Sequence, residues 1–216
     1  MSQPKAVMFD CWNTLFYAET RPLALRLLAS KLLHKRLSYA LTKRFERSVM
    51  LAPEVDPTTT ARKLLREFGL PPLPGLVSSV KRALLDADRH PYPDTFEVLQ
   101  KLRKQVKVGL ITNTLEVSFK PLREEFKLDS YFDVIMTSYE AGVLKPDPQI
   151  FRLALEKLGV APHEAVMVGD NARDDVAAAE AIGMTGILID RRQRHRDASR
   201  RIESLSELPA LVAKII

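Results

Sequence analysis

The sequence predicts an α/β protein with a doubly wound parallel sheet and a helical segment inserted after the first strand. From about residue 92 onwards, short apolar runs typical of strands alternate with amphipathic runs typical of helices, the order that builds a parallel sheet. Residues 17–91 contain helical patterns only. We therefore expect a Rossmann-like core of residues 1–16 and 92–216, interrupted by an inserted helical domain of residues 17–91.

The first expected strand is short and ends at an acidic residue. Residues 5–9, with the sequence KAVMF, lead directly into Asp10. In the inserted segment, leucines recur at helical spacing, Pro53 and Pro57 interrupt the chain, and Thr58 can cap the helix that follows. The helices expected here cover residues 22–51, residues 58–65 and a stretch that ends near residue 88.

The second half of the chain alternates between strands and helices. Pro91 and Pro93 break the chain, and the apolar runs that follow are separated by amphipathic segments. The strands are expected at residues 106–111, 134–136, 165–168 and 186–189. The helices are expected at residues 95–104, 117–126, 148–158, 174–182 and 205–215.

Polar side chains stand near the ends of these strands, at the edge where a parallel sheet binds its ligands. Each of them alone can be explained as a helix cap, a turn residue or a surface charge. Their gathering at one edge predicts a functional site. The residues are Asp10, Thr112, Asn113, Lys145, Asp170, Asp174 and Asp175.

These residue types fit the displacement of a group from an anionic substrate. Asp10 can act as a nucleophile, and Lys145 or a metal ion can hold the substrate's negative charge. Mg²⁺ prefers oxygen ligands, so Asp10 and Asp170 can bind it together with waters and substrate oxygens. Thr112 can donate its hydroxyl to a substrate oxygen. The set favours displacement at phosphorus or at a polarised carbon.

Four motifs, in this order, resemble those of the haloacid dehalogenase superfamily of hydrolases. They are FDCWNTLF at residues 9–16, LITN at 110–113, GVLKPDPQIF at 142–151 and VGDNARDDVAAAEAIGM at 168–184. The resemblance extends over essentially the whole chain and includes a helical cap inserted after the first motif.

The resemblance implies a role for each residue at the strand ends. Asp10 would be the nucleophile that forms a covalent intermediate, and Thr112 and Lys145 would bind and neutralise the transferred group. Asn113 would contact the substrate. The cofactor would be Mg²⁺. Its ligands would be Asp10, Asp170 and the backbone carbonyl of Trp12, with Asp175 or Asp174 supporting the metal's waters.

Trp12 departs from the pattern of the family's phosphatases. They carry a second Asp at this position as general acid and base, because an alkoxide leaving group needs a proton. The haloacid dehalogenases carry an aromatic residue there, since halide leaves without one. Other features point away from a dehalogenase, because Phe151 stands where dehalogenases typically have Tyr and Asp170 suits a metal that they do not need.

Three functions therefore stand open on the sequence. The favoured one is a Mg²⁺-dependent hydrolase of a small phosphorylated or similarly anionic substrate. The second is a 2-haloacid dehalogenase, and the third is a catalytically weak binding or regulatory module that has kept the fold. The cap would set the choice of substrate, and Arg44 and Arg47 are the candidates for a substrate-binding arginine.

The composition indicates which binding partners and which cellular compartment to expect. Residues 17–91 carry 14 Lys and Arg against 7 Asp and Glu, so we expect the cap to attract anionic substrates. The basic run RRQRHR, residues 191–196, lacks interleaved aromatic residues, which argues against nucleic-acid binding. No apolar run is long enough to span a membrane, and the single cysteine, Cys11, fits a reducing cytoplasm. The sequence does not indicate an oligomeric state.

Overall fold

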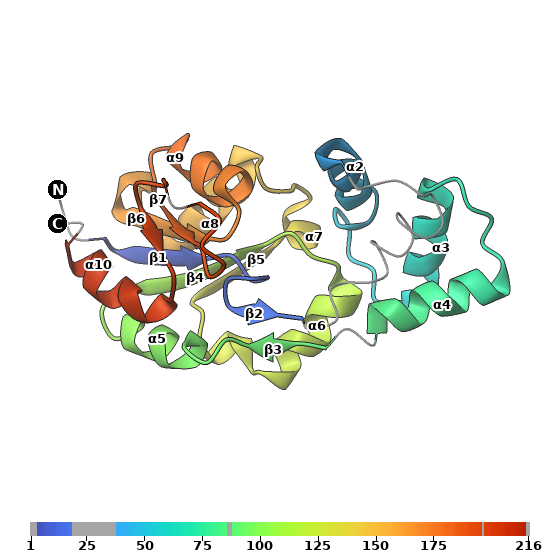
Figure 1. The fold of residues 1–216 in the computed structure, drawn as a ribbon, viewed down its shortest axis with the longest axis horizontal. Helices are drawn as coiled ribbons and strands as arrows, with labels where there is room; N and C mark the ends of the chain where they lie inside the picture. The colour runs from blue at the N-terminus through green and yellow to red at the C-terminus, as the bar shows by residue number, and fades with distance from the viewer. Residues whose placement is uncertain (1–3, 19–37, 86–87, 196, 215–216) are drawn as a thin grey trace.

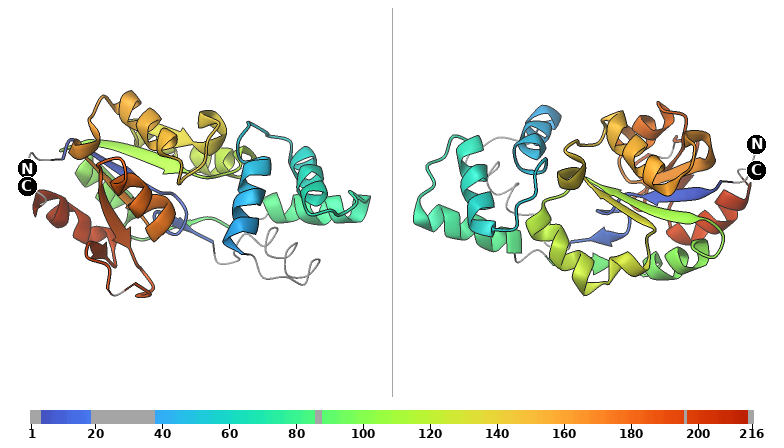
Figure 2. Two further views of the ribbon diagram at one scale, coloured as in Figure 1. Left: turned by 90° about the horizontal axis from the view of Figure 1, so that it is seen from above. Right: turned by 180° about the vertical axis from the view of Figure 1, so that it is seen from behind.

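Two lobes lie side by side in the structure, which is a computed structural model that describes residues 4–18, 38–85, 88–195 and 197–214 (Figure 1). The sheet lobe is built around a parallel β-sheet and contains residues 4–17 and the described residues from 90 onwards. The helical lobe contains residues 38–85. Figure 2 shows both lobes from two further sides, and in the view from behind α4 of the helical lobe lies beside α6 of the sheet lobe.

The sheet has six strands within the described part of the chain, all paired in parallel in the order β5-β4-β1-β6-β7-β8. The predicted fold class is thereby confirmed. Because β1 pairs with β4 on one side and with β6 on the other, the strand order reverses at β1. The strands are β1 (Ala6–Phe9), β4 (Lys107–Thr112), β5 (Val134–Thr137), β6 (Ala165–Gly169), β7 (Thr185–Ile189) and β8 (Arg201–Ile202).

Helices cover both faces of the sheet, so β1 is buried on both sides and reads as a continuous apolar run. Val7 and Phe9 pack into one core cluster with α5, α6 and α10, whereas Ala6 and Met8 pack into a second with α8 and α9. The helices are α5 (Thr95–Leu102), α6 (Glu116–Glu125), α7 (Ser138–Ala141), α8 (Pro148–Leu158), α9 (Ala178–Glu180) and α10 (Leu208–Lys214).

The helical lobe has an apolar core of its own. Its helices are α2 (Tyr39–Val49), α3 (Pro57–Glu67) and α4 (Pro74–Leu85). Phe45 of α2 and Leu64 of α3 are buried in this core, and Leu115 and Val117 at the start of α6 join it from the sheet lobe. The two lobes therefore share an apolar contact as well as chain connections.

Two short strands carry the chain between the lobes. β2 (Phe16–Tyr17) leaves the sheet lobe and β3 (His90–Pro91) returns to it, and the two pair antiparallel. The ring of Tyr17 packs against the rings of His90 and Tyr92, with centroids 5.5 and 4.8 Å away. Strand pairing and ring packing therefore hold β2 and β3 together at the boundary of the lobes.

Several local expectations need correction. The side chain that caps α3 is Asp56, not Thr58, because its carboxylate accepts from the backbone N–H groups of Thr58 and Thr59. The helix expected at 174–182 is a π-helix, Ala172–Ala177, that continues into α9. The helix expected at 205–215 begins as a 3₁₀ turn, Leu205–Glu207, before α10. Most of the helix expected at 22–51 lies outside the described residues, which resume at residue 38.

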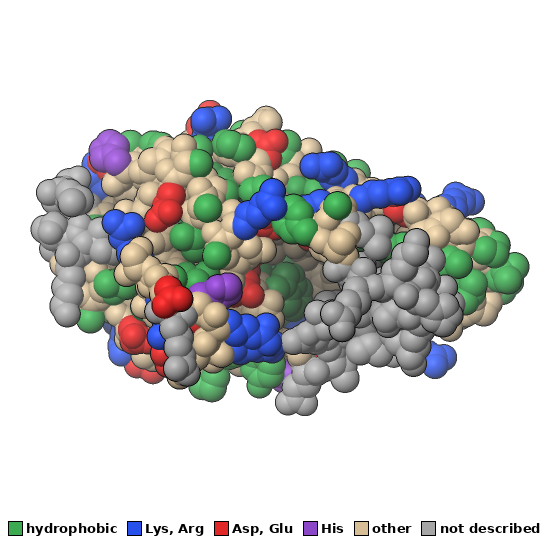
Figure 3. All heavy atoms as spheres, turned by 45° about the horizontal axis from the view of Figure 1, so that its top comes forward, with side chains coloured by type: hydrophobic (Ala, Val, Ile, Leu, Met, Phe, Trp, Pro, Cys, Tyr) green, Lys and Arg blue, Asp and Glu red, His purple; other side chains and the backbone are tan. Residues whose placement is uncertain are grey.

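No helix among the described residues is both long and apolar enough to cross a membrane. On the face drawn in Figure 3, Lys and Arg side chains are scattered over both lobes among acidic ones and do not form one continuous patch.

Candidate active site

Asp10 lies at the point where the strand order reverses. It follows β1 directly, and its backbone N–H donates to the carbonyl oxygen of Val168 in β6 at 2.8 Å. Its side chain is nearly buried, and the hydroxyl of Thr14 donates to its Oδ2 at 3.5 Å. The main chain of the sheet thus fixes where this carboxylate stands.

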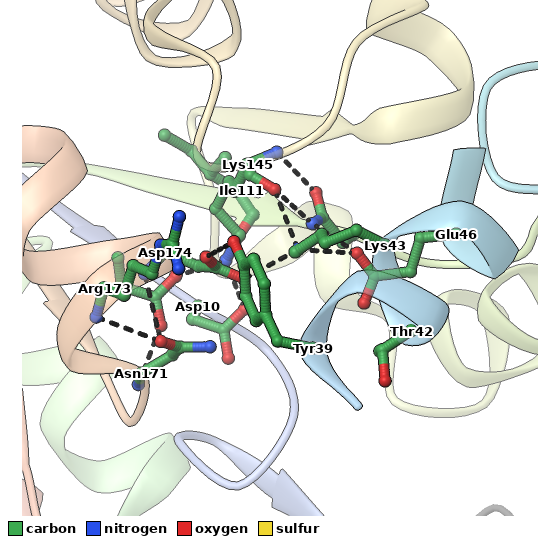
Figure 4. A network of polar contacts seen from close by, with 12 residues as sticks. Asp10, Tyr39, Thr42, Lys43, Glu46, Ile111, Lys145, Asn171, Arg173 and Asp174 are labelled. Carbon is green, nitrogen blue, oxygen red and sulfur yellow. Dashed lines mark hydrogen bonds and ion pairs between the residues drawn. The ribbon is translucent and has the colours of Figure 1, made fainter. Parts of the chain in front are cut away.

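Lys145 reaches the same point from the loop between α7 and α8. Its Nζ lies 2.5 Å from Asp10 Oδ1, 2.6 Å from Asp175 Oδ1 and 3.0 Å from the carbonyl oxygen of Ile111 (Figure 4). Burial alone would lower the pKa of this lysine, but the charges of Asp10 and Asp175 outweigh that effect and raise it. Lys145 is therefore a fixed positive charge between two carboxylates.

Three carboxylates converge beside this lysine. Asp10, Asp170 and Asp175 each offer an oxygen, and these oxygens lie within 4.8 Å of one another. Burial raises the pKa of Asp170, and the charges of Asp10 and Asp175 raise it further. The pKa of Asp175 is also raised, by burial and by Asp10, against the opposing effect of Lys145. A cluster of hard oxygen ligands of this size fits a divalent cation such as Mg²⁺, which would relieve the repulsion.

Asp174 and Asp175 have different partners, although they are adjacent. Asp175 points into the sheet lobe, where it binds Lys145 and accepts from the backbone N–H of Asn171 at 3.1 Å. A Cβ at Gly169 would lie 2.3 Å from Asp175 Oδ2, so glycine is needed there. Asp174 instead points toward the helical lobe. Of the two residues expected to support a metal, the geometry favours Asp175.

Thr112 and Asn113 end β4 next to Lys145. Thr112 is fully buried, and its hydroxyl oxygen has no hydrogen-bond partner among the described residues. It is therefore available to a ligand. The amide of Asn113 donates to the Lys145 carbonyl at 2.9 Å and accepts from the Lys145 N–H at 2.8 Å. The Asn113 side chain thus binds the backbone of Lys145, and its amide N–H also donates to Glu46 Oε2 of α2 at 3.5 Å. The expected contact of Asn113 with substrate stays a prediction.

The helical lobe reaches this site through Lys43, a residue that the sequence analysis missed. Its buried ammonium lies 2.6 Å from Asp174 Oδ2, 2.6 Å from Glu46 Oε2 and 3.1 Å from the carbonyl oxygen of Lys145. The hydroxyl of Tyr39 also donates to Asp174, at 2.9 Å. Tyr39, Lys43 and Glu46 recur at helical spacing, opposite the buried Phe45, and this polar stripe was the signal that could have found them.

The two arginines proposed as substrate ligands are placed differently relative to the site. Arg44 points away from the site and pairs with Glu67 of α3 at 2.7 Å, with its side chain 69% exposed. Arg47 lines a pocket of about 380 Å³ between α2 and residues 142–148, which Lys43 and Lys145 also line. The structure thus brings Lys43, rather than Arg44, to the strand-end carboxylates.

The loop of residues 11–15, here called the first-motif loop, carries Trp12. The Trp12 side chain is half-buried against the core of the sheet lobe. Asn13 has a φ of 60°, and its backbone N–H donates to the Phe16 carbonyl at 2.6 Å. The adjacent Cys11 is buried, and burial raises the pKa of its thiol, so it is not a reactive thiolate.

This sheet, with paired acids at its switch point and a lysine between them, is the architecture of a known class of hydrolases. The model of the haloacid dehalogenase-like hydrolase family matches residues 4–183. The chain belongs to that family and is a hydrolase, as its motifs predicted.

Named relatives include several phosphatases. The chain is 34% identical to a glyceraldehyde 3-phosphate phosphatase of Methanopyrus kandleri over 202 residues, which are 89% of this chain and 86% of the relative. It is 37% identical to a phosphoserine phosphatase of Thermus thermophilus over 111 residues, but that match covers 50% of this chain and 45% of the relative.

Solved structures show the same fold. A haloacid dehalogenase-family phosphatase of Thermococcus onnurineus is 30% identical and superposes with a TM-score of 0.64, covering 96% of this chain and 97% of its own. A 2-haloacid dehalogenase of Pseudomonas syringae superposes with a TM-score of 0.68 at 24% identity, covering 99% of this chain and all of its own. At that identity, the second likeness bears on the fold alone.

Proposed function

We propose that this protein is a Mg²⁺-dependent phosphatase that acts on a small phosphorylated substrate and uses Asp10 as its nucleophile. The observation that carries the proposal is the convergence of Asp10, Asp170 and Asp175 around Lys145. Three acids beside one lysine leave an excess of negative charge, which a divalent cation would offset. The relative with the longest overlap described above is named for a phosphorylated triose, which is a small phosphorylated molecule but an alkyl phosphate rather than an activated one.

The proposed reaction begins with attack by Asp10. A carboxylate oxygen of Asp10 forms a bond to phosphorus, the bond from phosphorus to the leaving oxygen breaks, and that oxygen takes a proton from solvent. Water then hydrolyses the aspartyl phosphate, which releases phosphate and restores Asp10. Lys145 and the unpartnered hydroxyl of Thr112 would hold the phosphoryl oxygens through both steps.

The metal would be held by Asp10 and Asp170, together with the backbone carbonyl of Trp12. Asp175 would orient Lys145 and support the waters on the metal. Bound Mg²⁺ supplies Lewis-acid stabilisation of the negative charge on the phosphoryl group. Asn113 contributes by fixing the backbone from which the Lys145 side chain extends.

Trp12 shapes the substrate range in this proposal. Its indole N–H is far too weak an acid to protonate an alkoxide as it leaves, so esters of poor leaving groups would react slowly. Acyl and aryl phosphates, whose leaving groups need little protonation, would react faster. We therefore expect a preference for activated phosphates over simple alkyl phosphates.

The helical lobe would serve as the cap that selects substrates, with the domain limits given above: residues 17–91 for the cap and residues 1–16 and 92–216 for the catalytic core. The contacts of Lys43 and Tyr39 with Asp174 support this role, because they place α2 over the strand-end carboxylates (Figure 4). The substrate would enter between α2 and the sheet edge. The buried, single Cys11 is compatible with a reducing compartment such as the cytoplasm.

Trp12 also favours a second candidate, a 2-haloacid dehalogenase, because halide needs no proton. The test is a screen of alkyl, aryl and acyl phosphates and of 2-haloacids, each with Mg²⁺ and with a chelator. Phosphate release that requires Mg²⁺ would support the proposal, and chloride release that persists in chelator would replace it with the dehalogenase. Ligand binding without turnover in either assay would point to the binding or regulatory module.

A further inference from the structure

Arg191, the first residue of the basic run at 191–196, is set apart from its neighbours. Arg192 and Arg194 are exposed, whereas the side chain of Arg191 is 14% exposed and points inward. Arg191 follows β7 and Asp190, so it leaves the sheet at the same edge as Asp10. The proposed function assigns it no role.

The guanidinium of Arg191 binds two segments at once: the segment that returns from the helical lobe and the first-motif loop. Its Nη2 and Nη1 bind Asp94 Oδ1 and Oδ2 at 2.9 and 3.2 Å, and the group lies 3.7 Å from the centre of the Tyr92 ring. Both residues belong to the segment that returns from the helical lobe. Nη2 also donates to the carbonyl oxygen of Thr14 at 3.0 Å. A planar, forked cation can make these contacts together, but a lysine cannot.

The Thr14 carbonyl matters because of where it lies in the chain. Thr14 is in the first-motif loop, two residues after Trp12, and its hydroxyl approaches Asp10 Oδ2. The loop turns sharply, since Asn13 has a positive φ and the Leu15 N–H donates back to the Cys11 carbonyl at 2.9 Å. A hold on the Thr14 carbonyl therefore fixes the orientation of the neighbouring peptide groups.

Asp94, the carboxylate that binds Arg191, has further hydrogen-bond partners. Asp94 accepts from the Ser204 hydroxyl at 2.7 Å and from the Leu205 N–H at 2.8 Å, in addition to Arg191. Burial raises the pKa of Asp94, but its hydrogen bonds with Arg191 and Ser204 outweigh that effect and lower it. The carboxylate thus stays ionised near neutral pH, and its pair with Arg191 stays charged.

We propose that Arg191 is a positioning residue that fixes the first-motif loop, so that the Trp12 carbonyl faces the metal beside Asp10, which the sheet itself holds in place. The part that concerns the metal rests on the proposed function. The part that concerns the loop does not, because it rests on the contacts of Arg191 alone.

The chain contains its own reporter for this proposal, because Trp12 is its single tryptophan. Its fluorescence therefore reports on the first-motif loop without added labels. We would compare the wild type, Arg191→Lys and the matched control Arg192→Lys, which changes the exposed neighbour in the same way. Each would be measured for acrylamide quenching of Trp12, for Mg²⁺ titration of its fluorescence, and for thermal melting.

In Arg191→Lys we expect Trp12 to become more open to quenching and the Mg²⁺ concentration for half-saturation to rise by about tenfold, as loss of a residue behind a metal ligand typically causes. Arg192→Lys should match the wild type. An Arg191→Lys protein that melts cooperatively with unchanged quenching and unchanged Mg²⁺ titration would overturn the proposal.

Two other results are possible: Arg191→Lys does not fold, or the wild type does not bind Mg²⁺. If Arg191→Lys does not fold, Asp94→Asn provides the second variant, because it keeps the arginine and weakens its anchor. The same rise in quenching is then expected, and no rise would overturn the proposal. If the wild type itself does not bind Mg²⁺, the proposed metal site fails, while the quenching comparison still decides whether Arg191 holds the loop.

Discussion

The carboxyl edge of the sheet and helix α2 meet at the same site, but they are held there differently. At the sheet edge, Asp10 is fixed by a backbone hydrogen bond to β6, and Lys145 is fixed by a buried pair with Asp10 and by the amide of Asn113. Helix α2 reaches the site through side chains, chiefly Lys43 and Tyr39 on Asp174.

This difference suggests that the sheet edge carries out the chemical step and that α2 selects the substrate. The ion pairs of the Lys145 ammonium with Asp10 and Asp175 lie within the sheet lobe, whereas α2 contacts Lys145 only at its backbone carbonyl, through Lys43. We therefore expect these ion pairs to persist if α2 moves away. The contacts of α2 would be lost together, since Lys43 and Tyr39 share Asp174 as a partner. Substitutions at the sheet edge should therefore affect the chemical step, whereas substitutions on α2 should affect substrate binding.

The largest effect is expected from Asp10→Asn. An amide is a poor nucleophile and a weak metal ligand, so turnover should fall by at least about 10³-fold. The replacement is nearly isosteric and should leave the fold intact, which a thermal melt would check. Turnover close to that of the wild type would show that Asp10 is not the nucleophile.

Trp12→Asp should increase the rate of alkyl phosphate hydrolysis. Restoring an acid beside Asp10 should accelerate hydrolysis of an alkyl phosphate by up to roughly 10²–10⁴-fold, with little gain on an acyl phosphate. The comparison of the two substrates in one folded variant is the measurement. A stable Trp12→Asp protein without selective gain on the alkyl phosphate would argue against a phosphatase limited by its leaving group.

Gly169→Ala tests the packing behind the metal site. The added Cβ would stand 2.3 Å from Asp175 Oδ2, so this carboxylate must move away from Lys145. We expect Mg²⁺ affinity, measured by calorimetry, to fall by about 10- to 100-fold. Gly75→Ala in α4 is the control, because a Cβ at Gly75 would have no atom within 4 Å, and it should leave Mg²⁺ affinity unchanged. Equal Mg²⁺ affinity in Gly169→Ala and the wild type would contradict the assignment of Asp175.

The smallest effect is expected on α2, from the pair Lys43→Met and Arg44→Met. Lys43→Met removes the buried cation over the site and should raise KM for a phosphorylated substrate by about 3- to 10-fold, with a smaller change in kcat. Arg44→Met removes an exposed cation one position along and should leave KM unchanged. Equal effects of the two substitutions would mean that the helical lobe attracts substrates by its overall charge only.

The sequence predicted the sheet and its strand-end residues because both depend on local patterns. Buried parallel strands read as apolar runs, and the residue after each run, such as Asp10 or Asp170, falls at the binding edge by topology alone. The order of the motifs then identified the family.

Features that depend on tertiary contacts were not predicted. Arg191 looks like an ordinary surface cation in the sequence, and its partner Asp94 lies far away along the chain. The polar stripe on α2 marks Lys43 as one of its members, but not its burial against the distant Asp174. β8 is two residues long and carries no recognisable alternation. Asn113 was expected at the substrate from its position after the strand, and only the fold shows that its amide also binds the backbone of Lys145.

The most direct test of the central claim is phosphate release from acetyl phosphate as a function of Mg²⁺ concentration, in the wild type and in Asp170→Asn. The account predicts saturable activation by Mg²⁺ in the wild type, complete loss in chelator, and a strong shift to higher Mg²⁺ concentrations in Asp170→Asn. Phosphate release that does not respond to Mg²⁺ or chelator, or that is the same in both proteins, would contradict it.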